Sequence, residues 1–342
     1  MKKSLFFVAT AAVVLASCSS DVKISENVAL EGSNAQKEIA FTSYAQKPRR
    51  AADTCHYAID GTTFPTKLNM YVAAYQVKPT AINYFAGTQF TYKNASAKWG
   101  GVTPKYWPLD SCYINFLAYA NVTGTAAFDA TDYASAAVIT QTDNSSAQTD
   151  LMYAIGNGAV TKTGNTLAFP ESVPMQFFHA QAWMDFYVVA NSDAEEAITI
   201  NSITLKGAKY SGTYTITHTN YNQKTGQSVA GAWTLTASQK DVVVPGWTPA
   251  ALTQSLVQVG KGLMIVPDDN ASTADWSSFV INYSFNGSDY NYEYALATDA
   301  AKSVAQKTHY VFNITFKLHE ILVSATVADW TDAPASNITV QD

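Results

Sequence analysis

The chain has 342 residues, of which 14% are charged, and its formal net charge at pH 7 is −6. An average globular domain has about 25% charged residues, so polarity here comes largely from Thr, Ser, Asn and Tyr, a composition that suits an extracellular β-protein. The negative charge argues against a nucleic-acid partner. The length allows two domains of ordinary size.

The N-terminal residues have the order of a secretory signal. Lys2 and Lys3 precede an apolar run from Leu5 to Leu15, which is too short to span a bilayer. The Leu-Ala-Ser-Cys sequence that ends at Cys18 resembles the lipobox of bacterial lipoproteins. This resemblance implies that residues 1–17 are removed and that lipidated Cys18 anchors the precursor in a membrane. An ordinary signal with an incidental cysteine is the alternative.

The rest of the chain divides by its patterning. Residues 18–36 have little periodicity and are predicted to form a flexible tether. Residues 37–50 contain a short strand, with Ile39 and Phe41 on one face, and a loop. Two strand-rich parts follow, and we expect an N-terminal domain over 51–170 and a C-terminal domain over 171–342.

Alternation of apolar and polar residues dominates both parts. It is clear over residues 113–120 and 279–285 and clearest over 310–319, where every second side chain is large and apolar. Many such strands predict an all-β fold of sandwiches. We expect only a few short helices, one over residues 248–260 with Leu252, Leu256 and Val259 on its apolar face, and a turn or two over 127–137.

Residues that could carry chemistry form no known catalytic or metal motif in the sequence. The five histidines are scattered, and we find no zinc spacing, phosphate-binding glycine loop or nucleophile motif. We therefore expect no cofactor, no metal and no enzymatic activity. Most of the seven tryptophans are expected in the core or at sheet edges rather than on a sugar-stacking surface.

Two further residue types bear on processing. Cys55 and Cys112 remain if Cys18 carries lipid, and they form either a disulfide or two buried free thiols. Arg49 and Arg50 are the only arginines in the chain, so an arginine-specific protease would have one region to cut. A solvated basic loop in an arginine-poor protein is the alternative.

Several segments resemble a known family in their order and spacing. These are the lipobox, the short strand followed by arginine, Tyr106-Trp107-Pro108, Phe178-His179-Ala180 with the following Trp183-Met184-Asp185-Phe186, and the run from Thr308 to Ile314 with the later Ala328-Asp329-Trp330. Together they resemble the fimbrillins, the FimA-like pilins of type V pili in Bacteroidales. The resemblance covers nearly the whole chain and is most specific near its C-terminus.

The resemblance implies two tandem transthyretin-like β-sandwich domains and an assembly mechanism. A lipidated precursor at the outer membrane would lose its first strand, with Ile39 and Phe41, to an arginine-specific protease at Arg49 or Arg50. A strand from a neighbouring fimbrial subunit would then fill the gap. The candidate donor here, with Ile338 and Val340, is short and follows Pro334, which leaves open a stalk, tip or terminating subunit.

A second function is compatible with the same sequence. The aromatic content and the export signal also suit a surface-exposed glycan-binding lipoprotein, which would remain uncut and monomeric. The fimbrial subunit, with adhesion as its role and the cell-surface fimbrium as its place, is the preferred interpretation.

Overall fold

A computed structural model describes residues 36–44, 70–93, 95–120, 124–128, 136–141, 145–146, 148–191, 198–217, 221–222, 227–228, 231–236, 239–267, 278–295, 304–317, 321–329 and 336–338. These residues form strands, turns and loops without a helix, which confirms the predicted all-β class. Consequently, none of them forms a helix that could cross a membrane. All of them belong to one compact unit, Gln36–Asp342.

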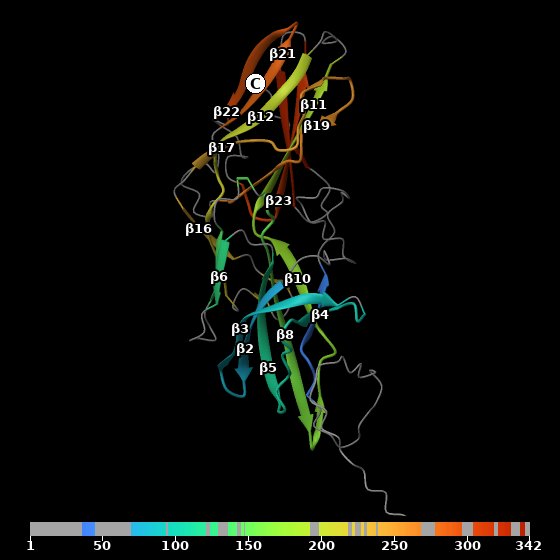
Figure 1. The fold of residues 1–342 in the computed structure, drawn as a ribbon, viewed down its shortest axis with the longest axis vertical. Helices are drawn as coiled ribbons and strands as arrows, with labels where there is room; N and C mark the ends of the chain where they lie inside the picture. Colours follow the sequence, from blue (N-terminus) through green and yellow to red (C-terminus); the bar gives the residue numbers. More distant parts are fainter. Residues whose placement is uncertain are drawn as a thin grey trace, which may run out of the picture. The chain divides into compact units, whose positions relative to one another are not determined.

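Seven strands of the largest sheet form a closed ring (Figure 1). The hydrogen-bonded order is β1, β4, β3, β2, β5, β8 and β10, and β10 pairs with both β8 and β1. Every strand of this N-terminal ring therefore has a neighbour on both sides. The short β9 (Thr166–Ala168) pairs antiparallel with the C-terminal end of β8. The strands are β1 (Ala40–Tyr44), β2 (Met70–Lys78), β3 (Ile82–Lys93), β4 (Lys98–Gly101), β5 (Cys112–Ala120), β8 (Met152–Thr163) and β10 (Val173–His179).

Strands β2 and β5 and the first five residues of β8 are buried on both faces, which explains their nearly continuous apolar sequences. Alternate residues fill the interior of the ring, and the others lie under a cover formed by β13 (Gly212–Thr217) and β16 (Ala232–Leu235). Tyr214 of the cover packs between Tyr153 and Trp233, with ring centroids 5.2 Å and 4.9 Å away. The Trp233 indole N–H donates to the Ala180 carbonyl at 2.6 Å.

The cover belongs to a four-stranded sheet that unites distant parts of the chain. Its order is β16, β13, β7 (Ala136–Gln141) and β6 (Gly124–Phe128), with β13 antiparallel to β7. Strands from both sides of residue 170 thus share one sheet. The domain boundary near residue 170 stays a prediction.

The C-terminal half contains two more sheets (Figure 1). One has β11 (Ala182–Ala190) parallel to β23 (Thr308–Phe316), followed by β24 (Ile321–Asp329) and β25 (Ser336–Ile338). The other has the order β17 (Gln239–Val243), β12 (Ile198–Lys209), β21 (Ser278–Phe285) and β22 (Ser288–Ala295). Short strands complete the fold: β14 (Tyr221–Asn222), β15 (Gln227–Ser228), β18 (Ala250–Ala251), β19 (Val257–Gln258) and β20 (Leu263–Ile265).

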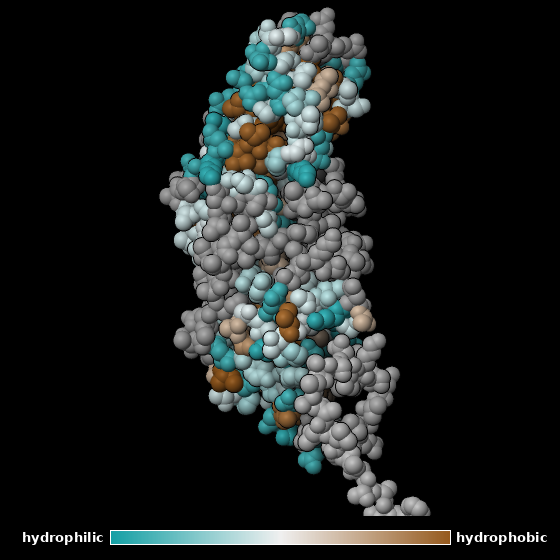
Figure 2. Space-filling view, viewed as in Figure 1, coloured by the Kyte–Doolittle hydropathy of each residue, from teal (hydrophilic) through white to brown (hydrophobic). Residues whose placement is uncertain are grey.

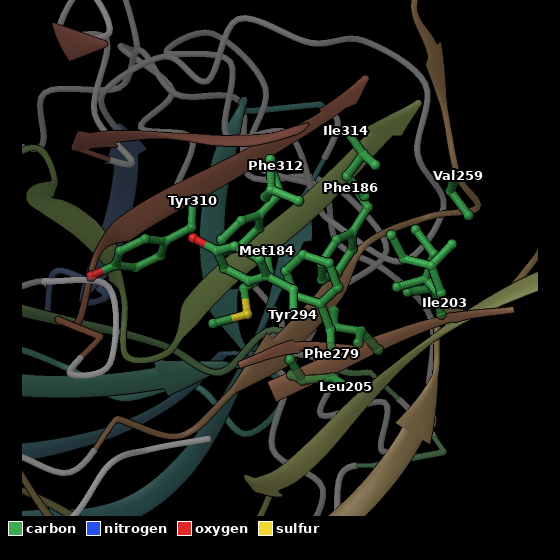
Figure 3. Close-up of a cluster of buried hydrophobic side chains, with 14 of the residues drawn as sticks. Met184, Phe186, Ile203, Leu205, Val259, Phe279, Tyr294, Tyr310, Phe312 and Ile314 are labelled. Carbon is green, nitrogen blue, oxygen red and sulfur yellow. The ribbon is translucent and has the colours of Figure 1, made fainter. Parts of the chain in front are cut away.

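Aromatic side chains join these two sheets in a common core (Figure 3). Phe186 of β11 lies 5.2 Å from Phe279 of β21 and 5.3 Å from Phe312 of β23, measured between ring centroids. The predicted alternation of β23 is confirmed, because its residues are buried and half-buried in strict turn. Burial of each large apolar side chain contributes roughly 1.5–3 kcal/mol.

The helix predicted over residues 248–260 is wrong. That segment contains β18 and β19, and its amides donate to neighbouring strands: Leu252 N–H to Ile198 O and Val259 N–H to Phe186 O. The helical spacing misled because Leu256 points to solvent and is 53% exposed, whereas Val259 is buried. The turn expected over 127–137 begins and ends in strands β6 and β7, and the residues between them lie outside the described part.

Truncation of the central phenylalanine of β23 should destabilise the protein strongly. Phe312→Ala removes a ring that contacts both Phe186 and Phe279, so the free energy of unfolding should fall by about 3–5 kcal/mol. Leu256→Ala, in an exposed loop, should change it by less than about 0.5 kcal/mol. Urea unfolding followed by tryptophan fluorescence measures both, and equal effects would contradict this assignment of the core.

Candidate functional site

Strand β1 lies between β4 and β10 and completes the N-terminal ring. It is antiparallel to β4, where Phe41 is opposite Trp99, and parallel to β10, where Phe41 is opposite Val173. Just before the strand, the Ile39 N–H donates to the Lys105 carbonyl at 2.7 Å. The backbone of this segment is therefore paired on both sides.

The two apolar side chains of this segment, Ile39 and Phe41, are both fully buried. The Phe41 ring meets the rings of Phe90 and Phe116 edge-on, with centroids 4.8 Å and 5.1 Å away. Such aromatic pairs add roughly 0.5–1.5 kcal/mol beyond the burial of their area. The space that Ile39 and Phe41 fill inside the ring is named the β1 slot below.

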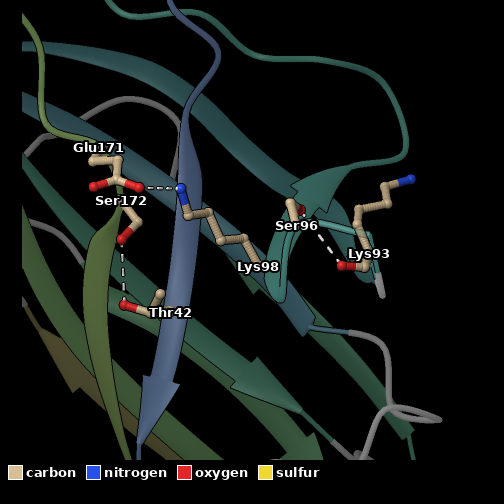
Figure 4. A network of polar contacts seen from close by, with 6 residues as sticks. All are labelled: Thr42, Lys93, Ser96, Lys98, Glu171 and Ser172. Atoms are coloured by element: carbon tan, nitrogen blue, oxygen red, sulfur yellow. Dashed lines mark hydrogen bonds and ion pairs between the residues drawn. The ribbon is translucent and has the colours of Figure 1, made fainter. Parts of the chain in front are cut away.

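Polar contacts lie on the outer face of β1 (Figure 4). Lys98 of β4 donates to Glu171, which precedes β10, with 2.7 Å between Nζ and Oε1. This hydrogen bond and the charge of Lys98 lower the pKa of the Glu171 carboxyl. The hydroxyls of Thr42 and Ser172 lie 3.4 Å apart on the same face.

Several other predicted site residues lie outside the described part of the chain. These are Cys18, Arg49, Arg50, Cys55 and Val340. Their predicted roles in lipidation, processing, disulfide formation and strand donation stay predictions.

Two predicted residues outside β1 are described. Cys112 is buried, and burial raises the pKa of its thiol. Because Cys55 is outside the described part, the disulfide stays a prediction. Ile338 lies on β25, where it is opposite Ala325 of β24.

Sequence reasoning missed two histidine–aspartate pairs. His179 Nδ1 lies 2.7 Å from Asp150 Oδ2, and both side chains are buried. His309 Nε2 lies 2.9 Å from Asp185 Oδ2, and the imidazole stacks on Trp183 with centroids 4.6 Å apart. Partners so distant in sequence leave no local signal. Across the described residues, no group of three or more His, Cys, Asp or Glu side chains could hold a metal ion.

Two features of the described surface bear on whether it holds a site comparable with the β1 slot: the apolar areas on one face of the molecule and the burial of three tryptophans. On the face drawn in Figure 2, the described apolar residues form several separate areas among hydrophilic ones. The tryptophans Trp99, Trp107 and Trp233 are buried, as predicted, so they offer no surface for sugar stacking. The β1 slot is thus the best-defined candidate site.

Comparisons with known proteins agree with this fold. No curated protein matches the chain. A proposed cell adhesion protein from Bacteroides uniformis superposes with a TM-score of 0.51 at 18% identity, covering 86% of this chain and 99% of that protein. One from Bacteroides ovatus gives 0.52 at 13% identity, with coverage of 90% and 100%. At these identities the likeness shows the fold alone.

The family follows from the sequence match. The model of the fimbrillin-like family matches residues 56–330, which is most of the chain. The chain belongs to the fimbrillin-like family.

Proposed function

We propose that this protein is a structural subunit, stalk or tip, of a cell-surface fimbria that serves adhesion, and not an enzyme. It is made as a lipoprotein precursor, and removal of its first strand lets a strand of another subunit take that place. The observation that carries the proposal is the position of β1, which closes the ring between β4 and β10. Family membership and similarity to proposed adhesion proteins support it.

Loss of β1 would change the ring in two ways. The facing edges of β4 and β10 would lose their hydrogen-bonding partner, and an open sheet edge is a template for another strand. The β1 slot would also expose the apolar surface that Ile39 and Phe41 now cover. An incoming extended segment satisfies both needs, because its backbone pairs with the edges and alternate side chains fill the slot.

The C-terminal segment of a second subunit is the proposed occupant. Ile338 and Val340 have the two-residue spacing of Ile39 and Phe41, so both could face the slot from one strand. In the structure, β25 pairs antiparallel with β24 of the same chain. Donation to another subunit would require that pairing to open.

The proposed partners follow from this mechanism. They are other fimbrial subunits, an arginine-specific protease that cuts at Arg49 or Arg50, and the outer membrane through lipid on Cys18. After cutting, the body of the protein separates from its lipid and resides in the fimbrium. A glycan-binding lipoprotein remains the alternative, and the burial of Trp99, Trp107 and Trp233 weighs against it.

The contribution of β1 to the precursor can be measured directly. Phe41→Ala should lower the free energy of unfolding by about 3–5 kcal/mol, because the ring is fully buried against two others. Thr42→Val, on the outer face of the same strand, should change it by less than about 1 kcal/mol. If urea unfolding gives both variants the same stability, β1 does not fill the slot.

Cleavage should convert the precursor from monomer to polymer. Purified precursor treated with an arginine-specific protease should be cut after Arg49 or Arg50. Its apparent molecular mass, measured by light scattering, should then increase. Arg49→Ala/Arg50→Ala should stay uncut and monomeric, while the neighbouring control Lys47→Ala should behave as wild type. Wild-type protein that is cut, releases its N-terminal fragment and remains monomeric at high concentration would refute strand exchange at this site.

Lipidation is tested in a host that modifies lipoproteins. The full-length chain should incorporate an alkyne fatty acid, and Cys18→Ser should abolish the label because the acceptor thiol is gone. Cys55→Ser is the matched control and should keep the label. Labelling that survives in Cys18→Ser would show that Cys18 is not the lipidated residue.

A further inference from the structure

An ion pair connects the two neighbours of β1 across the strand itself. Sheet order places β1 between β4, which carries Lys98, and β10, which Glu171 precedes. Figure 4 shows the Lys98 side chain starting on one side of β1 and meeting Glu171 on the other. The contact, 2.7 Å from Nζ to Oε1, makes no use of any atom of β1. We name it the bridging pair.

The outward-facing side chains of β1 are small where the bridging pair crosses the strand. Ile39 and Phe41 face the interior, so alternation turns Ala40 and Thr42 outward. Ala40 is opposite Gly100 on β4, and these two residues offer the least side-chain bulk of the face. Trp99 faces the interior, so its neighbour Lys98 faces outward and reaches across β1 to Glu171, while the side chains of Lys93 and Glu38 lie over Gly100.

The pair differs in exposure at its two ends. The Lys98 side chain is 21% exposed and the Glu171 side chain 82% exposed. An exposed ion pair contributes little to global stability. A short strand, however, opens locally at a far smaller cost than global unfolding, so a weak contact across it changes how often it opens.

We propose that the bridging pair retains β1 in the slot and must separate before that strand leaves or another enters. It would re-form only over an occupant whose outward residue at the position of Ala40 is small. Retention of β1 needs no assumption about polymerisation, whereas the entry of another strand rests on the proposed function.

Hydrogen–deuterium exchange of the intact full-length protein tests retention. In Lys98→Met and in Glu171→Gln, the amides of Ala40–Tyr44 should exchange about two- to five-fold faster than in wild type, the range set by a weak exposed pair. The amides of Thr308–Phe316 should be unchanged, because β23 is remote in the pairing order. Lys162→Met is the matched control, since it removes an ion pair with Asp110 that does not cross β1.

A double-mutant comparison tests whether Lys98 and Glu171 act on β1 through their contact or independently of each other. Lys98→Met/Glu171→Gln should exchange no faster than either single variant, and Lys98→Glu/Glu171→Lys should restore slow exchange. High salt should raise the amide exchange rate of β1 in the wild-type protein toward that of Lys98→Met/Glu171→Gln. The exchange rate of Lys98→Met/Glu171→Gln itself should not change with salt. Wild-type exchange rates in the single variants, or additive acceleration in the double variant, would overturn the proposal.

The outcome is distinguishable from a failure of the proposed function. Faster opening of β1 in the variants, together with a cleaved wild-type protein that never polymerises, would support the bridging pair and refute strand exchange. Unchanged opening of β1 in the variants, together with normal polymerisation of the cleaved wild-type protein, would refute the bridging pair and support strand exchange.

Discussion

Closure of the N-terminal ring depends on β10, which forms hydrogen bonds with a different strand on each side. Its pairing with β8 is antiparallel and its pairing with β1 is parallel. Among the strands of the ring, β1 comes first in the sequence, and each of the others is connected to ring strands before and after it or to the C-terminal half. One cut after β1 would therefore remove its covalent connection to the rest of the ring, whereas the other strands are connected at both ends.

The link from the ring to the C-terminal half is as firmly bonded as the strands it joins. It consists of Ala180 and Gln181, between β10 and β11. Ala180 donates to the Leu151 carbonyl and accepts from the Trp233 indole, while the Gln181 side chain accepts from the Leu151 N–H. The Gln181 carbonyl accepts from Lys307. Domain linkers are ordinarily exposed and make few contacts, whereas Ala180 and Gln181 are fully buried and hydrogen-bonded.

The sequence predicted what depends on local alternation and missed what depends on distant partners. The strict period of β23 identified its buried face because a half-buried strand needs no knowledge of its neighbour. The false helix over 248–260 arose because two short strands can carry apolar residues at helical spacing. The ion pair between Lys98 and Glu171 joins residues 73 positions apart, and no local pattern indicates such a contact.

The candidate site was predictable in part for the same reason. Ile39 and Phe41 alternate with smaller residues, so a short strand with one apolar face could be expected. Its neighbours could not, since β4 and β10 are separated from it by other strands in the sequence. His179 is the last residue of β10, and Asp150 lies two residues before β8. Their contact depends on how these two strands pair in the ring, so no local pattern in the sequence predicts it.

The sheet that combines β7 with β13 constrains the order in which the chain can fold. β7 ends at Gln141, but its partner β13 begins at Gly212 and the covering strand β16 ends at Leu235. Until that later stretch has emerged, Tyr153 and the other apolar residues on the outer face of the ring have no cover. Chains emerge at roughly 5–20 residues per second, and exposed apolar surface in such intermediates favours aggregation. The ring itself is complete at His179, but its outer apolar face stays uncovered until the chain has been made as far as Leu235.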